Sequence, residues 1–105
     1  MARKTKVNNI TTPELLSNVC NENKELLLDF EDYLRSVQRS ELTIFNYKND
    51  IQIAWIWNLQ HNNNIPFTEW TKRQVIRYQN WLLNENKNSP ARIKRLKASL
   101  SSLSN

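Results

Sequence analysis

Apolar residues recur at three- and four-residue intervals along most of the chain, which is the spacing of one helix face, and no segment of useful length alternates as a strand would. The pattern is clearest in the segment SPARIKRLKASLSSLSN at residues 89–105. Ser89 can accept hydrogen bonds from first-turn amides, and Pro90 suits the first helical position. We therefore predict a capped helix that begins at Pro90. Its apolar stripe comprises Ile93, Leu96, Leu100 and Leu103.

Two helices are predicted near the N-terminus. Thr12 is placed to cap, and Pro13 to begin, a brief helix in the segment TPELLSNVC. A second helix is predicted from about Glu22 to Val37, with one face toward the core. The residues expected on that face are Leu26, Phe30, Tyr33, Leu34 and Val37, and those expected largely off it are Asp29, Glu31 and Asp32.

The longest predicted helix is capped by Ser40 and covers the segment SELTIFNYKNDIQIAWIWNLQ. Its main stripe comprises Ile44, Tyr47, Ile51, Trp55 and Leu59. Three more apolar residues, Ile53, Ile56 and Trp57, point away from that stripe. Either this helix is central and covered by neighbours on both sides, or the three residues form an exposed patch for a partner.

A loop and one more helix complete the pattern. Three adjacent Asn followed by Ile65 and Pro66 favour turn backbones, so we predict a loop over 62–66. Thr71 and Gln74 form a capping box that starts the segment KRQVIRYQNWLLNEN. Its stripe is Val75, Tyr78 and Leu82, with Ile76 and Leu83 beside it.

These elements predict an all-α fold, a compact bundle of four main helices with an additional short N-terminal helix or arm. We expect the arm to occupy residues 1–20 and the globular domain to occupy residues 21–105.

Composition limits the chemistry that this chain can carry. A chain of 105 residues suits one domain that folds without metals or disulfides. The absence of glycine excludes phosphate-cradling loops and dinucleotide fingerprints. The single histidine, His61, and the single cysteine, Cys20, allow no two-His metal site, no cysteine zinc cluster and no internal disulfide. We therefore expect no cofactor, no metal and no catalytic residue, and a structural role for Cys20.

Hydropathy and the N-terminus argue against a membrane or an exported protein. The mean hydropathy is −0.72, and no apolar run approaches the ~20 residues of a membrane span. The basic start, MARKTKVNNITTPE, lacks the apolar core of a secretory signal.

Charge is distributed unevenly, although it sums to only +5. Residues 13–39 carry six acids against three bases, whereas the chain from Lys87 onward carries five bases and no acid. With a pI near 9.6, this clustering indicates an acidic partner such as nucleic acid. The alternative is a solvated amphipathic helix that closes a bundle. The face opposite the apolar stripe of the last helix comprises Ala91, Lys94, Arg95, Ala98 and Ser102.

Four segments in order resemble the core-binding domain of tyrosine recombinases, the phage-integrase family. They are LLLDFEDYLRSV, S-x-x-T-x-x-x-Y-x-x-D-I-x-x-A-W, FTEWTKRQVIRYQNWL and SPARIKRLKASLSSL, and together they extend over about residues 22–105. The positions that match are Phe30, Tyr33 and Leu34; Thr43, Tyr47 and Asp50; Thr71; and Ser89, Arg95, Ala98 and Leu100.

The resemblance implies a SAM-like module that binds double-stranded DNA, with two helices crossing near a right angle and entering adjacent grooves. In this chain those helices start at Ser40 and Ser89. Threonine, serine and lysine side chains suit phosphate oxygens, whereas Asn46, Arg92 or Arg95 could reach base edges. Lys48 and Lys97 lie at the edges of their stripes and are expected to extend outward. The DNA-binding residues implied are Thr43, Asn46, Lys48, Ser89, Arg92, Lys94, Arg95 and Lys97.

A complete recombinase of this family also has a catalytic domain with Arg, His and a tyrosine nucleophile, which the segments above do not include. Tyr33, Tyr47 and Tyr78 stand at core spacing and are expected to be packed aromatics. We therefore expect a DNA-binding part of a larger integrase that does not cut or join DNA alone. The partners implied are double-stranded DNA, the catalytic domain of the same parent protein and other recombinase protomers in a synapse, in the cytoplasm of a bacterium.

Two other functions stay open at this point. A stand-alone helix-turn-helix regulator would share the charge but needs a tight turn that often contains glycine. A helical protein-interaction module would use Ile53, Ile56 and Trp57.

Overall fold

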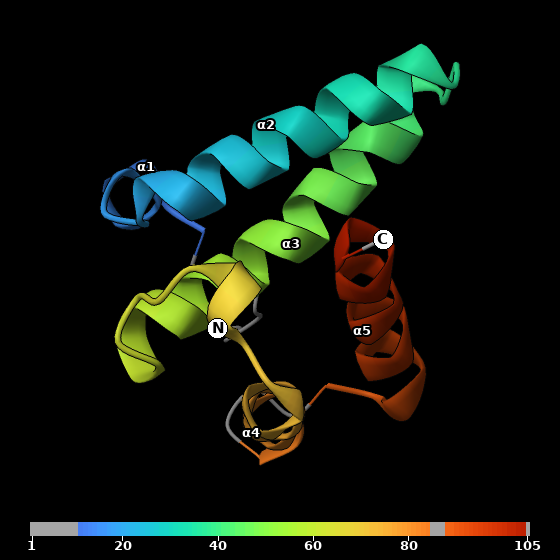
Figure 1. Cartoon of the computed structure of the whole chain (residues 1–105). Helices are drawn as coiled ribbons and strands as arrows, with labels where there is room; N and C mark the ends of the chain where they lie inside the picture. Colours follow the sequence, from blue (N-terminus) through green and yellow to red (C-terminus); the bar gives the residue numbers. More distant parts are fainter. Residues whose placement is uncertain (1–10, 85–87, 105) are drawn as a thin grey trace.

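The computed structural model describes residues 11–84 and 88–104. Over these residues the chain is all-α, without a strand, and the predicted architecture of four main helices and a short N-terminal one is confirmed (Figure 1). The elements are α1 (Pro13–Ser17), α2 (Asn21–Ser36), α3 (Glu41–His61), a 3-10 turn (Phe67–Glu69), α4 (Lys72–Asn84) and α5 (Pro90–Ser104).

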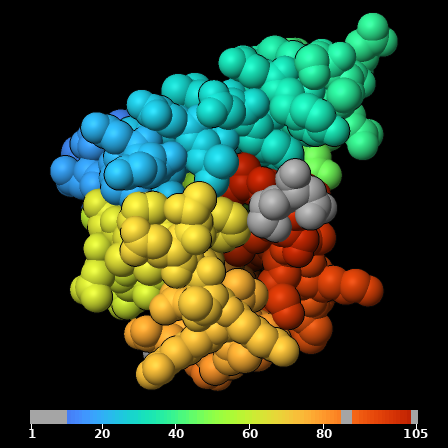
Figure 2. All heavy atoms as spheres, in the orientation of Figure 1, coloured from blue at the N-terminus to red at the C-terminus, as the bar shows by residue number. Residues whose placement is uncertain are grey.

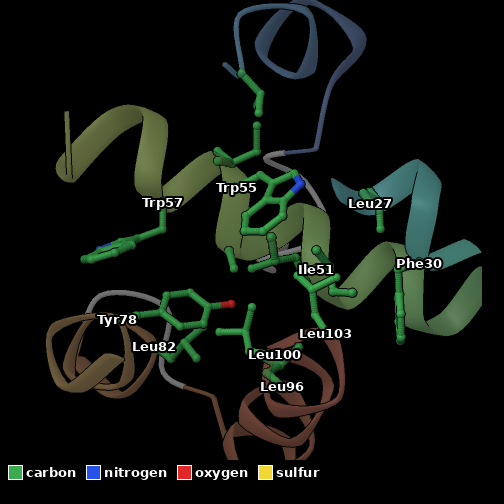
Figure 3. Packing of buried hydrophobic residues seen from close by; sticks show 14 of the residues in the cluster. Leu27, Phe30, Ile51, Trp55, Trp57, Tyr78, Leu82, Leu96, Leu100 and Leu103 are labelled. Atoms are coloured by element: carbon green, nitrogen blue, oxygen red, sulfur yellow. The ribbon is translucent and has the colours of Figure 1, made fainter. Parts of the chain in front are cut away.

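Helix α3 is the centre of the fold, with α1 and α2 packed on one side and α5 on another. Ile53, Ile56 and Trp57 are all buried, so the interpretation of a helix covered on both sides is confirmed. The exposed patch required by the interaction-module hypothesis is therefore absent at these residues. Trp57 packs against Trp70 at a ring-centre distance of 5.4 Å. It also packs against Tyr78 at 5.5 Å (Figure 3).

The predicted helix starts are confirmed by their capping hydrogen bonds. The Ser40 Oγ accepts from the Thr43 amide at 3.1 Å, and the Ser89 Oγ accepts from the Arg92 amide at 3.2 Å. The Thr71 amide donates to the Gln74 Oε1 at 2.7 Å, as a capping box requires. Each cap forms between residues three apart, which is why the sequence alone reveals it.

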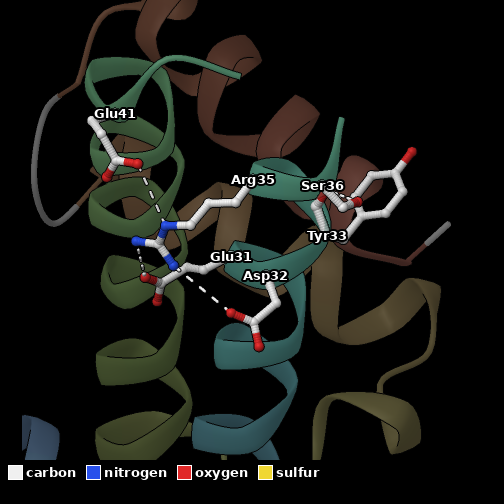
Figure 4. Close-up of polar contacts among 6 residues, drawn as sticks. All are labelled: Glu31, Asp32, Tyr33, Arg35, Ser36 and Glu41. Carbon is white, nitrogen blue, oxygen red and sulfur yellow. Dashed lines mark hydrogen bonds and ion pairs between the residues drawn. The ribbon is translucent and has the colours of Figure 1, made fainter. Parts of the chain in front are cut away.

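The turn between α2 and α3 fixes the start of α3. Gln38 adopts a left-handed backbone with φ 64°, and the Arg39 amide donates to the Leu34 carbonyl oxygen at 3.0 Å. This is the Schellman arrangement that closes many helix C-termini. Arg35 adds ion pairs to Glu31 and Asp32 on its own helix and, at 3.4 Å, to Glu41 of α3 (Figure 4).

The predicted core face of α2 is partly wrong. Tyr33 and Val37 are 58 % and 48 % exposed, while Leu27 is in the core and Glu31, expected off the core face, is buried. Leu27 belongs to the cluster of buried core residues, whereas the end of α2 stands out from the body of the molecule (Figure 2). Near that end, Tyr33 and Val37 line a hollow of about 370 Å³ instead of a filled core.

The predicted loop over 62–66 is confirmed, and it ties the N-terminal segment to α3. Asn63 and Asn64 have φ values of 60° and 53°, a left-handed backbone that asparagine tolerates. The Asn64 side chain accepts from the Cys20 amide at 3.0 Å and donates to the Asn18 carbonyl oxygen at 3.0 Å. Val19, between these two residues, is buried in the core.

Residues 1–10 of the predicted arm lie outside the described residues. Its short helix, α1, is present and packs against α3. The division of the chain at residue 20 stays a prediction.

Candidate nucleic-acid interface

Helix α5 has the two faces that its sequence predicts. Its apolar stripe is buried against α3 and α4, and Leu96 is only 1 % exposed. Lys94, Arg95 and Ala98 lie on the exposed side.

A groove lies where α5 passes alongside α3, and we call it the α3–α5 groove. It has a volume of about 210 Å³ and contains three of the DNA-binding residues predicted from sequence, two from α3 and one from α5. Residues 45 or more positions apart in the chain are thereby brought to one surface. The groove is lined by Thr43, Asn46, Tyr47, Asp50, Arg95, Ala98 and Ser99.

Asp50 is buried at the base of this groove, where it joins the two helices. Asp50 is 4 % exposed, and its carboxylate accepts from Arg95 Nη2 at 2.8 Å and from the Ser99 hydroxyl at 2.9 Å. The Arg95 side chain is 58 % exposed, so the ion pair extends from the core to the surface. A buried carboxylate with two such donors is well compensated for its lost hydration.

The sequence interpretation placed Asp50 among the family positions but gave it no contact, and it did not single out Ser99. A signal was present, since Asp50 directly precedes the mostly apolar segment Ile51–Trp57. An acid that starts a buried stretch of helix needs a cation or hydroxyl partner. The partners could not be identified, because they lie 45 and 49 residues further along the chain.

Thr43 and Ser89 both take part in helix starts. The Thr43 hydroxyl accepts from the Ser40 hydroxyl at 2.9 Å and faces the groove. Ser89 is exposed at the first turn of α5.

Lys94 and Lys97 lie on the α4 side of α5. Both line a hollow of about 240 Å³ between these helices, and the Lys97 ammonium donates to the Gln79 Oε1 at 2.8 Å. Arg92 is half-buried and lies about one helical turn before Arg95 on α5. All three lie on the same helix as Arg95 but outside the α3–α5 groove.

Lys48 is the predicted site residue that the structure separates from the others. It lines a hollow formed with α1 and α2, beside Lys24 and Gln52. On α3 it lies nearly opposite Asn46, since a separation of two residues turns a helix by about 200°.

The three tyrosines differ in their surroundings. Tyr78 is fully buried, and the half-buried Tyr47 packs edge-on against Phe30 at 5.5 Å. The expectation of a packed aromatic is wrong for Tyr33, whose ring is largely exposed although it stacks on Phe30 at 6.4 Å.

Tyr78 points from α4 into the core (Figure 3). Burial raises the pKa of its hydroxyl far above the ordinary value, and the negative charge of Asp50 raises it further, while Arg92 acts in the opposite direction. Among the described residues, no group hydrogen-bonds the Tyr78 hydroxyl. This group is therefore neutral at physiological pH.

Residues 11–84 and 88–104 offer neither a metal-binding cluster nor a membrane-spanning helix. These residues include no cluster of three or more His, Cys, Asp or Glu able to hold a metal ion. The helices of the same part of the chain all fall short of the length and apolarity that crossing a bilayer requires. His61 is exposed at the end of α3, with its ring 5.9 Å from that of Trp81.

Comparison with known proteins gives one family match. The model of the family described as phage integrase, N-terminal SAM-like domain, matches residues 26–105, which includes α3, α4, α5 and most of α2. No curated protein and no solved structure matches the chain.

Proposed function

The chain belongs to the family of phage integrase N-terminal SAM-like domains, and from this premise we propose that it binds double-stranded DNA through α5 and the first half of α3. The observation that carries the proposal is the α3–α5 groove, which combines Thr43, Asn46 and Arg95 from two helices on one exposed surface. Side chains of these types are the ones that contact phosphates and base edges in DNA complexes.

The charges near the groove support a polyanionic ligand. Helix α5 carries four cations and no acid, and Asp50, which contacts this helix from α3, is already engaged by Arg95. On α2, Glu31 and Asp32 pair with Arg35, which also pairs with Glu41 at the start of α3, so these acids are partly neutralised by their own cation. The field around α5 is therefore positive where DNA would approach.

Each proposed contact has a role that follows from its placement. Ser89 and Lys94 are exposed and suit phosphate oxygens, and Thr43 can add its hydroxyl at the groove. Asn46 and Arg95 can present paired donors or acceptors to base edges. Arg92 and Lys97, which are half-buried, contribute mainly charge.

We further propose that this binding places a separate catalytic domain of the same integrase on its recombination site, within bacterial cytoplasm. The chain would then act with that domain and with other protomers in a synapse, and would not itself cut or join DNA. The family match supports this proposal because it is a match to the N-terminal domain of an integrase.

The test is a titration of labelled duplex with the chain at several salt concentrations. If about five phosphates are neutralised, log affinity should fall with log salt at a slope of about −4 to −5. Lys94→Ala should weaken binding to all duplexes and reduce the slope by about one.

Lys48→Ala is the matched control, because it removes the same charge from the side of α3 that faces α1 and α2. We expect it to alter affinity less than Lys94→Ala. Equal losses for the two variants would remove the assignment of the interface to the α5 side, and no binding at low salt would overturn the proposed function.

A further inference from the structure

Arg95 is held differently from the other cations of α5. Its guanidinium is anchored through Nη2 to the carboxylate of Asp50, a residue that is only 4 % exposed, and that carboxylate also accepts from the Ser99 hydroxyl. The Ser99 Oγ also lies 3.2 Å from the Arg95 carbonyl oxygen, the alternative acceptor for its single proton, so Ser99 is held close to the backbone of α5 at Arg95. The guanidinium is thus oriented by α3 and α5 together.

Such an anchor is poorly suited to a simple phosphate contact. The carboxylate cancels most of the arginine's charge, and charge is what a phosphate contact uses. Orientation, by contrast, is what base reading requires, because the planar fork of arginine must align with two acceptors on one base edge. The ion pair with Asp50 therefore weakens the attraction of Arg95 to phosphates and fixes the orientation of its guanidinium.

The neighbours of Arg95 leave room for a base edge. Asn46 and Thr43 line the same groove and carry no charge, and Ala98, one turn after Arg95, has only a methyl group. The guanidinium has five N–H donors, so the hydrogen bond through Nη2 leaves donor capacity for a further partner.

We propose that Asp50 and Ser99 orient Arg95 to donate two hydrogen bonds to O6 and N7 of a guanine in the major groove. Arg95 is then the specificity-determining residue of the DNA interface, and Asp50 is its positioning residue. The inference rests on the proposed DNA-binding function and adds the base that is read. Guanine is the base whose major-groove edge presents two acceptors to an arginine fork.

The experiment is a selection of bound duplexes from a random-sequence library by the wild-type chain and by Arg95→Lys, Asp50→Asn and Lys94→Ala. The wild type should enrich guanine at one fixed position. Arg95→Lys keeps the charge but lacks the fork, so it should lose that preference, and Asp50→Asn should lose it while binding random duplex at least as tightly as the wild type. Lys94→Ala, the matched control one residue away, should keep the guanine preference with weaker affinity for every duplex.

A second measurement replaces the selected guanine with 7-deazaguanine, which lacks N7. The wild type should lose about five- to a hundredfold in affinity, the range of discrimination given by one good bidentate contact, and Arg95→Lys should lose almost nothing. A purely structural role for Asp50 predicts weaker binding to all duplexes, not this selective loss.

The outcomes separate the two proposals. Absence of DNA binding by the wild type overturns both. Salt-dependent binding without a guanine preference, or a preference that survives in Arg95→Lys, overturns only the inference about Arg95. Because the Arg95 side chain is 58 % exposed, Arg95→Lys should fold even if Asp50→Asn does not, so this variant decides the question alone.

Discussion

Tyr78 shows how one buried group makes stability depend on pH. Its hydroxyl is buried, and its pKa is raised by burial and by Asp50, so the folded chain keeps the proton at pH values where an unfolded chain releases it. The contribution of this raised pKa to the free energy of unfolding is complete below about pH 10, the ordinary pKa of tyrosine. It is lost as pH rises above that value, by about 1.4 kcal/mol per pH unit. We expect alkaline unfolding that is steeper than the exposed Tyr33 could produce.

Tyr78→Phe tests this directly, because it removes the hydroxyl and keeps the ring. Within the described part of the chain that hydroxyl has no hydrogen-bond partner, so the variant should be at least as stable as the wild type at pH 7. Urea unfolding at pH 7, 9, 10 and 11 should show a flatter decline above pH 10 for the variant. Parallel declines for the two proteins would contradict the assignment to Tyr78.

Gln38 is a second residue whose backbone conformation should measurably lower the free energy of unfolding. It holds the left-handed position of the turn after α2, with φ 64°, in a chain that contains no glycine. Glycine pays no Cβ penalty there, so Gln38→Gly should raise the free energy of unfolding by about 0.5–1 kcal/mol. Thermal melting measures the gain, and Arg35→Gly, on the preceding turn of helix, should instead lower stability. A destabilised Gln38→Gly would mean that its side chain stabilises the turn.

At the scale of whole helices, the residues that cap each helix could be predicted from sequence, whereas the positions of the helices that pack against it could not. The starts of α3, α4 and α5 were predictable because each cap joins residues close in the chain. The face of α2 was not, because which of Leu27 or Tyr33 is buried depends on where α3 lies across it and on where α2 ends. Periodicity in the sequence predicts an apolar stripe about 100° wide on a helix. Which part of that stripe is buried depends on where the neighbouring helix packs.

Ser89 belongs to this scale because it serves both the helix and the proposed interface. Ser89→Asp retains a good cap and places a negative charge at the positive end of α5, so stability should change by less than about 0.5 kcal/mol. DNA affinity should fall about fivefold at low salt, since two charges about 4 Å apart in water interact by about 1 kcal/mol.

Ser89→Ala provides the converse variant. It removes the cap without adding charge and should lower the free energy of unfolding by about 1 kcal/mol. Chemical unfolding and DNA titration of both variants separate the two roles. Unchanged DNA affinity in Ser89→Asp would place the phosphate backbone away from the start of α5.

For the molecule as a whole, the groove illustrates the limit of sequence reasoning. Thr43, Asn46 and Arg95 were selected as residues by family resemblance, and their convergence on one groove required the packing of α5 on α3. Lys48 was selected by the same reasoning and lies on the other side of α3. Residue type and helix membership were thus predictable, whereas the side of the helix that remains exposed was set by the arrangement of all the neighbours.

The same packing decides what Trp57 does. It is 2 % exposed, and its ring lies between α3 and the segment that carries Trp70 and Tyr78, so it joins the two halves of the core. Trp57→Ala should cost about 3–5 kcal/mol, against a total stability of about 5–15 kcal/mol for a domain of ordinary stability. We expect the variant to be largely unfolded or to unfold at much lower urea concentration, as measured by circular dichroism. DNA binding should be lost in parallel.

Leu42→Ala is the control for Trp57→Ala, because Leu42 is on the same helix but 69 % exposed. It should change stability by less than about 0.5 kcal/mol, as substitutions at exposed sites away from special features do. If Trp57→Ala instead unfolded like the wild type and lost only a protein partner, Trp57 would have to be accessible in solution, and a protein-interaction role would replace its role in the core. Trp57 packs in the core from the same helix that carries Thr43 and Asn46, so the α3–α5 groove depends on its packing. Milder substitutions such as Trp57→Phe should therefore lower the free energy of unfolding and the DNA affinity together.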